Sequence, residues 1–529
     1  MSSEAPLEEH ARWLFTPFTG QVRDPIYGYI DFVKSSEGAV IDSWALQRLR
    51  YIYQLQAAHF VYPGATHTRF SHALGVMHLS YKYITHLLRS VVVGEGLELK
   101  HYREAVFAAR LLGLLHDIGH GPFSHAFDKH VYANKSFLGY RVGNHEVVGY
   151  LIYRNALRDL IKKAFSEEKA SLGVDVEVLL DLLDAGMKPP RGMKRFTELS
   201  SKGLLSGSDF FEPERSSDLG TITRMVVRDY VYTSDIMDYL KRDSYFTGVP
   251  IGEINDDWII RNSYVLKRGG RPAIAVASKV LDEIARMFDA RKLMYKYVYL
   301  HPVNVAFIET IGSLLHCVKS YITSILERVL EQPEGAAEYL KLTDHSIYSK
   351  LQELLFASLS EYECEDKQQA KKALESVFYK RKPPWKQVVR LTYDLREARA
   401  ISSEIVQEVV KRKIKEEVAS ELAHKGVSVS DVEVVVDKID VYPSAGAEIA
   451  STIEVVDVKD GRVVYTESIN LGEFAEKTGL KPEALVTIYV SRDVYKNLSN
   501  ADLSKAITIS KGVISSVVYG KREEAPETS

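Results

Sequence analysis

The feature that most constrains this chain is a nearly uninterrupted apolar segment, residues 103–116, that ends in a dense cluster of histidines and aspartates. Because only the start of the segment is polar, we predict a helix buried at the centre of a helical bundle and ended by the glycines and proline of residues 119–122. The next run, HDIGHGPFSHAFD, holds three histidines and two aspartates within 13 positions. Burying such groups without partners costs on the order of several kcal/mol each, and a bound cation would offset that cost. The sequence therefore predicts a metal site at the end of a core helix.

Helical periodicity dominates the first 384 residues. Apolar residues recur at helical spacing over residues 43–93, interpreted as two helices joined by a turn at Tyr62-Pro63-Gly64. Further helices are predicted over residues 144–165, 174–185, 221–242, 279–300, 303–330, 345–359 and 367–377. Between them, residues 188–219 are rich in proline, glycine and serine, which favours a long surface excursion or lid. We expect a mainly α fold, a helical core domain over residues 1–384.

Beyond Pro383-Pro384 the pattern changes. A charged helix is predicted at about residues 397–424, and runs rich in valine and isoleucine predict strands over residues 431–442, 452–458, 462–469 and 485–491. Lys459-Asp460-Gly461 between two of these runs is a hairpin signal. We therefore predict a small α+β carboxy-terminal lobe over residues 385–518 and a disordered acidic tail over residues 519–529.

Composition excludes several classes of protein. With 46% apolar and 26% charged residues, the 529-residue chain is neither disordered nor fibrous. Its 68 lysines and arginines against 71 aspartates and glutamates give a net charge of −3, so nucleic acid is a possible but not an expected partner. Cys317 and Cys364 are too few for a disulfide framework, which suits a reducing, cytoplasmic compartment. The amino terminus lacks the features of a signal peptide, and no apolar stretch approaches the roughly 18 residues that span a bilayer, so no membrane is expected.

Four residues are the predicted metal ligands. Adjacent helical residues point about 100° apart, so His116 and Asp117 can reach one cation only near a helix end, and the remaining ligands must come from elsewhere. His72 lies on a preceding helix and Asp235 on a later one, and a bundle brings such positions together. The metal is a divalent ion, with Mn, Fe, Mg, Zn and Ni all open.

The sequence resembles the HD-domain metal-dependent phosphohydrolases, and among them the deoxynucleoside triphosphate triphosphohydrolases of the sterile-alpha-motif-and-HD type. The matching motifs are DPIYG from Asp24, LQRLRYI from Leu46, PGATHTRF from Pro63, RFSH before the HD cluster, YLKRD from Tyr239 and LTD from Leu342. The resemblance extends into the carboxy-terminal lobe. The family's sterile-alpha-motif domain is expected to be absent, because the first motif begins at Asp24.

This resemblance implies a role for each matching residue. The metal ligands are His72, His116, Asp117 and Asp235, and the catalytic and phosphate-contacting group is His120, His125, Asp128, His145, Glu146 and Arg69. His125, restrained by Asp128, is the candidate that protonates the leaving 5′ oxygen. The substrate-binding residues are Gln54, Leu55, Tyr239, Asp243, Arg291 and Tyr299, with Tyr239 placed to exclude a 2′ hydroxyl. Asp42, Gln47 and Arg50 match an activator-nucleotide site at a subunit interface, which implies a homo-oligomer, a dimer or tetramer.

One departure from the family keeps alternatives open. Ile236 occupies the place of a phosphate-binding lysine, so Lys241, Arg242 or Arg291 would have to supply that charge. The first hypothesis is hydrolysis of a deoxynucleoside triphosphate to deoxynucleoside and inorganic triphosphate. The second is a nucleotidase or phosphodiesterase that acts on mono- or cyclic nucleotides. The third is a nucleic-acid-binding regulator with a vestigial site, suggested by basic runs such as Lys411-Arg412-Lys413.

Overall fold

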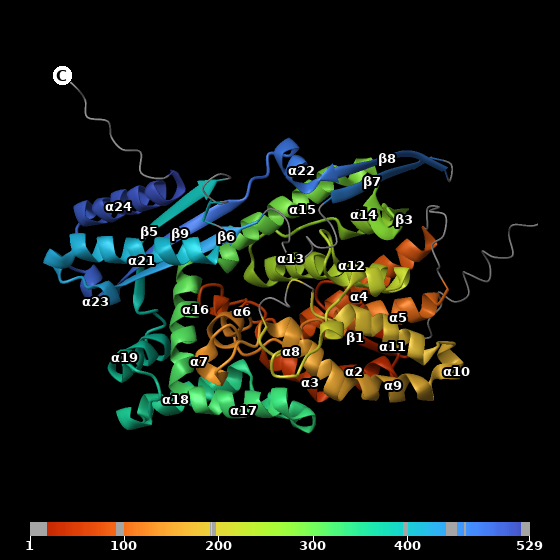
Figure 1. The fold of residues 1–529 in the computed structure, drawn as a ribbon, viewed down its shortest axis with the longest axis horizontal. Coiled ribbons are helices and arrows are strands. Elements are labelled where there is room, and N and C mark those ends of the chain that lie inside the picture. Colours follow the sequence, from red (N-terminus) through yellow and green to blue (C-terminus); the bar gives the residue numbers. More distant parts are fainter. Residues whose placement is uncertain are drawn as a thin grey trace, which may run out of the picture.

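The computed structural model describes residues 18–90, 100–190, 192, 197–394, 400–401, 403–440, 452–459 and 462–519. The fold is mainly helical with a few small sheets (Figure 1), which confirms the predicted fold class. The proposed disordered tail beyond Tyr519, the hairpin residues 460–461 and the amino-terminal 17 residues lie outside the described residues.

The core is built around helix α5 (Tyr102–Leu115), in which every residue from Glu104 onward is buried. It packs against α4 (Arg69–Arg89), α11 (Val176–Met187) and α12 (Asp218–Val227), as predicted from its apolar sequence. At Gly113 an added Cβ would lie 2.8 Å from the backbone nitrogen of Met77, so only glycine permits this close approach of α5 and α4. The two helices therefore meet tightly at the end of α5 that carries the histidine cluster.

Two of the predicted helices are interrupted. The segment from residue 43 forms only α3 (Trp44–Arg48) and short 3-10 turns before α4 begins, because the chain pairs Tyr53 with Thr68 and passes through a left-handed conformation at Gln56 (φ 56°). The predicted helix over residues 221–242 is divided into α12 and α13 (Ser234–Thr247). Asp229 between them has a φ of 59°, and the Thr233 side chain caps the new helix by accepting a hydrogen bond from the Ile236 N–H.

The remaining predicted helices are present. Helix α8 (His145–Ile152) continues through a π-helical turn (Tyr153–Leu157) into α9 (Arg158–Glu167). Helix α15 (Leu281–Met294) also ends in a π-helical turn (Tyr295–Tyr299). The others are α16 (Pro302–Leu315), α17 (Lys319–Glu331), α18 (Asp344–Phe356), α19 (Lys367–Phe378) and α21 (Glu404–Glu421). Helix α24 (Asn500–Tyr519) was not predicted. The described part of the excursion, residues 197–219, forms short 3-10 turns before α12 and buries Leu199, Leu205 and Phe210.

The sheets revise the predicted lobe. Strands β5 (Trp385–Asp394), β9 (Glu483–Ser491) and β6 (Val432–Ile439) form an antiparallel sheet in that order, covered by α21 and α24. Strands β7 (Thr452–Lys459) and β8 (Arg462–Asn470) instead extend a hairpin of the core, β3 (Ser263–Arg268) and β4 (Arg271–Val276), because β7 pairs in parallel with β4. A further hairpin joins β1 (Gly20–Asp24) and β2 (Gly28–Phe32). The lobe is therefore not one continuous unit, since residues 453–480 contribute to the main hydrophobic core.

Two findings bear on expectations drawn from composition. Cys317 and Cys364 form a disulfide, because the chain returns after α18 to the junction of α16 and α17 and brings their Cα atoms within 4.3 Å. The stretch Pro302–Glu331 is long and apolar enough to cross a membrane by length and composition alone, although 61% of its most apolar window is buried inside the protein. A buried core helix passes the same test, so this stretch is weak evidence for a membrane span.

Candidate metal centre

The four predicted metal ligands converge from three helices. His72 comes from the first turn of α4, His116 and Asp117 from the end of α5, and Asp235 from the first turn of α13. His72 Nε2 lies 3.1 Å from Asp235 Oδ1 and 3.7 Å from Asp117 Oδ2. His116 Nε2 lies 3.6 Å from Asp235 Oδ1 and 3.5 Å from Asp117 Oδ1. Two imidazole nitrogens and two carboxylates thus face a common point.

A hydrogen bond at Nδ1 fixes the orientation of each imidazole. His72 Nδ1 lies 2.7 Å from Asp238 Oδ2, and His116 Nδ1 lies 2.9 Å from the Gly113 carbonyl oxygen. Although burial raises the pKa of Asp238, Arg242 and His72 lower it to about 2, so the carboxylate accepts and His72 Nδ1 carries the proton. Both Nε2 atoms are left facing the centre, where a bound cation would take the place of a proton, and hydrogen bonds of this kind at Nδ1 are typical of metal-bound histidines.

An unsatisfied atom supports the fit to a cation. His116 Nε2 is buried and has no hydrogen-bond partner among the described residues. Imidazole and carboxylate together suit Mn, Fe, Zn and Ni, and the carboxylates also suit Mg. The residues present therefore fit a divalent ion without selecting one.

The electrostatics of the centre are dominated by carboxylates. Burial lowers the pKa of His72, but Asp235 and Asp238 outweigh that effect and raise it to about 10. Burial raises the pKa of Asp117, yet Arg69, in direct contact with Asp117 Oδ2, and the neighbouring histidines hold it well below its usual range. The centre therefore holds ionised acids in a buried place, which a cation would stabilise.

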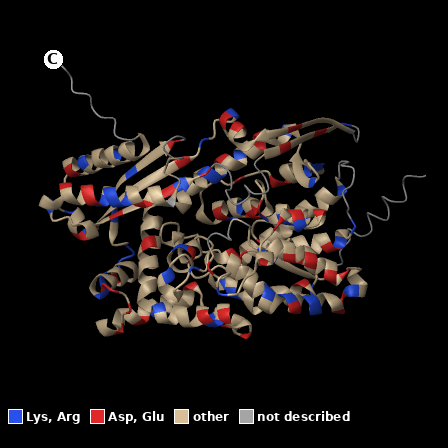
Figure 2. Cartoon of the chain, in the orientation of Figure 1, with Lys and Arg blue, Asp and Glu red and all other residues tan. Residues whose placement is uncertain are grey.

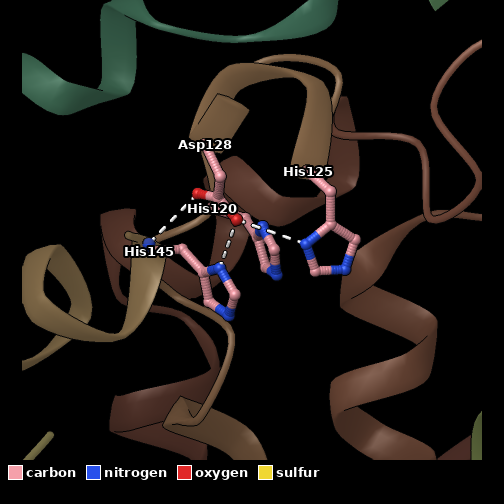
Figure 3. Close-up of side chains that lie close together, drawn as sticks. All are labelled: His120, His125, Asp128 and His145. Atoms are coloured by element: carbon pink, nitrogen blue, oxygen red, sulfur yellow. Dashed lines mark hydrogen bonds and ion pairs between the residues drawn. The ribbon is translucent and has the colours of Figure 1, made fainter. Parts of the chain in front are cut away.

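A second cluster of titratable side chains lies beside this centre. Figure 3 shows His120, His125 and His145 arranged around Asp128. Asp128 Oδ2 lies 2.6 Å from His145 Nδ1 and 3.2 Å from His125 Nδ1, while Asp128 Oδ1 accepts from the His145 backbone N–H at 3.1 Å. The His120 ring stacks on His145 with centroids 3.5 Å apart, and His120 Nε2 lies 3.5 Å from Asp117 Oδ1. The two clusters are thus contiguous, and the donor atoms of the second are also close enough to hold an ion.

The two histidines that share Asp128 differ in how firmly they are held. The side chain of His125, the predicted proton donor, is 62% exposed, whereas that of His145 is 15% exposed and makes the shorter contact. Burial lowers the pKa of His145, but Asp128 raises it above the ordinary value. Burial, Arg69 and His145 lower the pKa of His120 well below its usual range. His145 is therefore the histidine that Asp128 restrains most, and Asp128 stabilises its protonated form.

Arg228, a cation that the sequence analysis did not identify, lies at the carboxy-terminal end of α12. It contacts Glu146, which follows His145, and its guanidinium lies 3.8 Å from Asp229. Burial lowers the pKa of Arg228, but Glu146, Asp229, Asp117 and Asp235 together raise it. It is buried close to the acids of the metal centre. No sequence motif identifies Arg228. The only signal in the sequence was that Ile236 occupies the place of a phosphate-binding lysine, so that another residue would have to supply the charge.

The cations predicted to replace that lysine have other partners. Lys241 donates to Asp256 at 2.8 Å, and Arg242 is buried between Asp238 and Asp24. Of the three, Arg291 alone contacts a predicted substrate-binding residue, since its Nε donates to Tyr239 Oη at 3.1 Å. Ile236 itself is buried.

The predicted substrate-binding residues form one network. Tyr299 Oη donates to Asp243 Oδ2 at 2.7 Å, and His67, which the sequence analysis did not identify, lies 2.8 Å from the other Asp243 oxygen. The Gln54 backbone N–H donates to the His67 carbonyl at 3.0 Å. Gln54 Oε1 is buried without a hydrogen-bond partner in the described part of the chain. Leu55 is buried next to it.

The predicted activator residues lie at the surface corner between α2 (Glu37–Ile41) and α3. Arg50 Nε donates to Gln47 Oε1 at 2.7 Å and its guanidinium stacks on Phe70, 3.7 Å from the ring centroid. Gln47 Nε2 donates to the Ile41 carbonyl at 2.9 Å, and Asp42 ends α2 with an exposed side chain.

Comparisons with known proteins agree with this geometry. The family model described as HD domain matches residues 69–172, which contain His72, the HD cluster and His145. Deoxynucleoside triphosphate triphosphohydrolase SAMHD1 of Bos taurus is 27% identical over 286 residues, which cover 54% of this chain and 45% of SAMHD1. An uncharacterized protein of Mycoplasma pneumoniae is 30% identical over 280 residues, 52% of this chain and 55% of that protein. An uncharacterized protein of Methanocaldococcus jannaschii is 28% identical over 281 residues, 53% and 46% of the two chains.

The chain spans about half the length of these curated relatives. The family match covers the helices that supply His72, His116 and Asp117, and Asp235 is added from α13. The chain therefore contains an HD domain, the module of the metal-dependent phosphohydrolase superfamily.

Proposed function

We propose that this protein is a metal-dependent phosphohydrolase that cleaves deoxynucleoside triphosphates to deoxynucleoside and inorganic triphosphate. The observation that carries the proposal is the convergence of His72, His116, Asp117 and Asp235 directly beside the histidines around Asp128. The activity for which the SAMHD1 relative is named, in a match over about half of each chain, supports the triphosphate substrate.

The chemistry follows from the neighbouring side chains. A divalent ion held by the four ligands supplies Lewis-acid polarisation of a phosphate oxygen and activation of water. His145, held by Asp128, keeps a proton at Nε2 that it can donate to the leaving 5′ oxygen, with His125 as the exposed second candidate. Arg69, whose Nε donates to Ser124 Oγ at 2.8 Å, presents charge beside Asp117 for a phosphate.

Arg228 supplies the second cation in this proposal and compensates for Ile236. Its contact with Glu146, the residue after His145, places it on the side of the metal centre where the histidines around Asp128 lie, and we expect a triphosphate chain to extend toward it. We expect Arg228→Gln to raise the KM for a triphosphate about tenfold, the equivalent of one charge-assisted hydrogen bond, and to affect a monophosphate less. Steady-state kinetics on both substrates, with Arg228→Lys as the charge-retaining control, measures this. Equal effects on both substrates would remove Arg228 from the phosphate site.

The sugar side of the site is suited to a nucleoside. Gln54 Oε1, buried and unpartnered among the described residues, can accept a hydrogen bond from a sugar hydroxyl, and Asp243 offers a buried carboxylate nearby. The Tyr239 ring would occupy the space of a 2′ hydroxyl, which favours a deoxy sugar. The second candidate function, a nucleotidase or phosphodiesterase on mono- or cyclic nucleotides, is favoured by one observation, the apolar Ile236 in place of a lysine.

Product analysis tests the proposal. The purified protein is incubated with each deoxynucleoside triphosphate, and with ribonucleotide controls, in manganese, magnesium or iron, and the products are resolved. Release of inorganic triphosphate is expected, and inorganic phosphate alone would favour the second function. Asp117→Ala should abolish turnover, while the matched control Asp366→Ala, which removes a cap of α19, should not. Full activity of Asp117→Ala would overturn the mechanism.

A further inference from the structure

The loop that connects the two clusters has an unusual backbone. Phe123 and Ser124 are consecutive non-glycine residues with positive φ angles, 59° and 53°. Each such residue costs on the order of 1–3 kcal/mol and persists only where surrounding contacts hold it. The loop carries His120 before this turn and His125 directly after it. The contacts that hold the turn therefore set the spacing between these histidines.

A single buried carboxylate bridges this turn to the substrate side. Asp344, in the first turn of α18, accepts a hydrogen bond from the Phe123 N–H through Oδ1 at 2.7 Å and one from the Tyr53 N–H through Oδ2 at 2.9 Å. Ser124 Oγ donates to the Tyr53 carbonyl at 3.0 Å. The residue preceding Gln54 is thus bound to both Asp344 and the catalytic loop.

Arg48 and Tyr339 donate further hydrogen bonds to the same loop. Buried Arg48 donates to the His120 carbonyl at 2.8 Å and to the carbonyls of Tyr339 and Leu342 at 2.9 Å. Tyr339 Oη donates to the Gly119 carbonyl at 2.7 Å. Residues 339–344 therefore hold the loop at Gly119, His120 and Phe123, and they lie inside the chain segment that the disulfide between Cys317 and Cys364 closes.

We propose that Asp344 is a positioning residue for the phosphohydrolase reaction: its two carboxyl oxygens hold the turn of positive φ at Phe123 and Ser124 and fix His120 and His125 relative to Gln54. The proposal rests on the proposed function for its catalytic consequence. Two acceptor oxygens are required because both backbone groups are donors. Asparagine offers one acceptor, and its amide group would face the second N–H.

Asp344→Asn tests the proposal. We expect kcat to fall about 100-fold, the effect of misplacing by about 1 Å the His120 ring that stacks on His145 and lies beside Asp117, with KM changed less than about threefold and bound metal unchanged. Asp344→Glu, which keeps the carboxylate on a longer side chain, should recover part of kcat. The matched control Asp366→Asn changes an aspartate that caps α19 by accepting from the Gln369 N–H at 2.9 Å, away from the loop, and should leave kcat unchanged. Unchanged kcat in folded Asp344→Asn, or a loss of kcat that is fully accounted for by lost metal in the folded protein, would overturn the proposal.

Hydrogen exchange separates this proposal from the proposed function. In Asp344→Asn, backbone amides of residues 119–125 and Tyr53 should exchange faster than in the wild type, and those in Asp366→Asn should not. If the wild type hydrolyses no nucleotide, the proposed function fails, while unchanged exchange in that loop would overturn the positioning role by itself. Should Asp344→Asn not fold, Asp344→Glu is expected to fold and to show both the lower kcat and the faster exchange.

Discussion

Individual side chains have different roles in this site, as His125 and His145 illustrate. Both lie on one oxygen of Asp128, but His145 is closer, less exposed and fixed also through its own backbone N–H. A proton donor needs a defined position as well as a suitable pKa. Residue type alone does not distinguish the two histidines, so the sequence analysis predicted His125, which lies within the HD cluster, as the proton donor.

We therefore expect His145→Ala to lower kcat more than His125→Ala does. Loss of a general acid reduces rates by about 10²–10⁴-fold, and an exposed histidine that only contacts phosphate should cost about tenfold or less. Rates with each triphosphate under saturating metal measure the two effects. A substrate with a good leaving group, which needs no protonation, should restore much of the rate in the variant that lost the acid. If that rescue is found with His125→Ala instead, His125 is the proton donor.

At the scale of helices and strands, the sequence predicted what local periodicity determines. The apolar run of α5 and the paired runs of β7 and β8 were identified because each pattern lies within one segment. The interruption after α3 was missed because Asp344, far along the chain, holds Tyr53 out of a helix. The parallel pairing of β4 with β7 also joins segments far apart in the sequence. For this reason β7 was predicted in the carboxy-terminal lobe, although it pairs with a strand of the core. The metal ligands were predictable because titratable residues are dense in that segment. The LTD motif includes Asp344 but does not give its partners, and no local pattern gives the contacts of Arg228.

The disulfide closes the chain segment that contains residues 339–344. Cys317 and Cys364 are 47 residues apart in the sequence, and closing a loop of that length removes chain entropy worth about 4 kcal/mol from the unfolded state. We expect the Cys317→Ser, Cys364→Ser double variant, or the reduced wild type, to unfold at a lower temperature by several degrees. Reductant should not change the melting temperature of the double variant. Equal melting temperatures for oxidised and reduced wild type would show that the bond contributes nothing to stability.

Strand β6 carries a carboxyl group that should make stability depend on pH. Asp437 lines a cavity of about 540 Å³ with Lys129 and Glu309, and burial raises its pKa to about 6, above the ordinary value of 3.8. The folded state therefore binds the proton more tightly than the unfolded state. The stabilisation is present below about pH 4 and is lost as the pH rises through 6, by roughly 2–3 kcal/mol.

Asp437→Asn, which is neutral at every pH, should be more stable than the wild type at pH 8, by about half as much at pH 5, and nearly equal to it at about pH 3.5. Denaturant unfolding at these pH values measures the difference. The exposed Asp366→Asn variant is the control and should show no such pH-dependent gain. A difference between Asp437→Asn and wild type that is the same at all of these pH values would contradict the raised pKa.

Over the whole molecule, charges of both signs are interspersed along the outer helices (Figure 2). From α21, Lys411 pairs with Glu408 and Lys415 with Glu433.

Two hydrophobic cores are joined by more than one contact. The smaller core lies between the sheet β5-β9-β6 and helices α21 and α24. It meets α16 through a cluster of Val305, Ala306, Val435 and Tyr489. The larger core takes Ile453, Val455 and Phe474 from beyond residue 384.

This arrangement predicts that the helical core depends on the chain beyond residue 384 for its stability. A chain that ends at residue 384 would lose β7 and β8 from the edge of β4 and would expose the apolar surface that Ile453, Val455 and Phe474 cover, at a cost of about 1.5–3 kcal/mol for each large side chain. We expect such a chain to aggregate or to unfold at a much lower temperature than the full chain, with reduced metal binding. A fusion that restores residues 452–480 after residue 384 should recover part of the lost stability, because it returns the missing strands. If the chain of residues 1–384 instead melts cooperatively at the temperature of the full protein and binds metal equally well, the shared sheet is not part of what stabilises the HD domain.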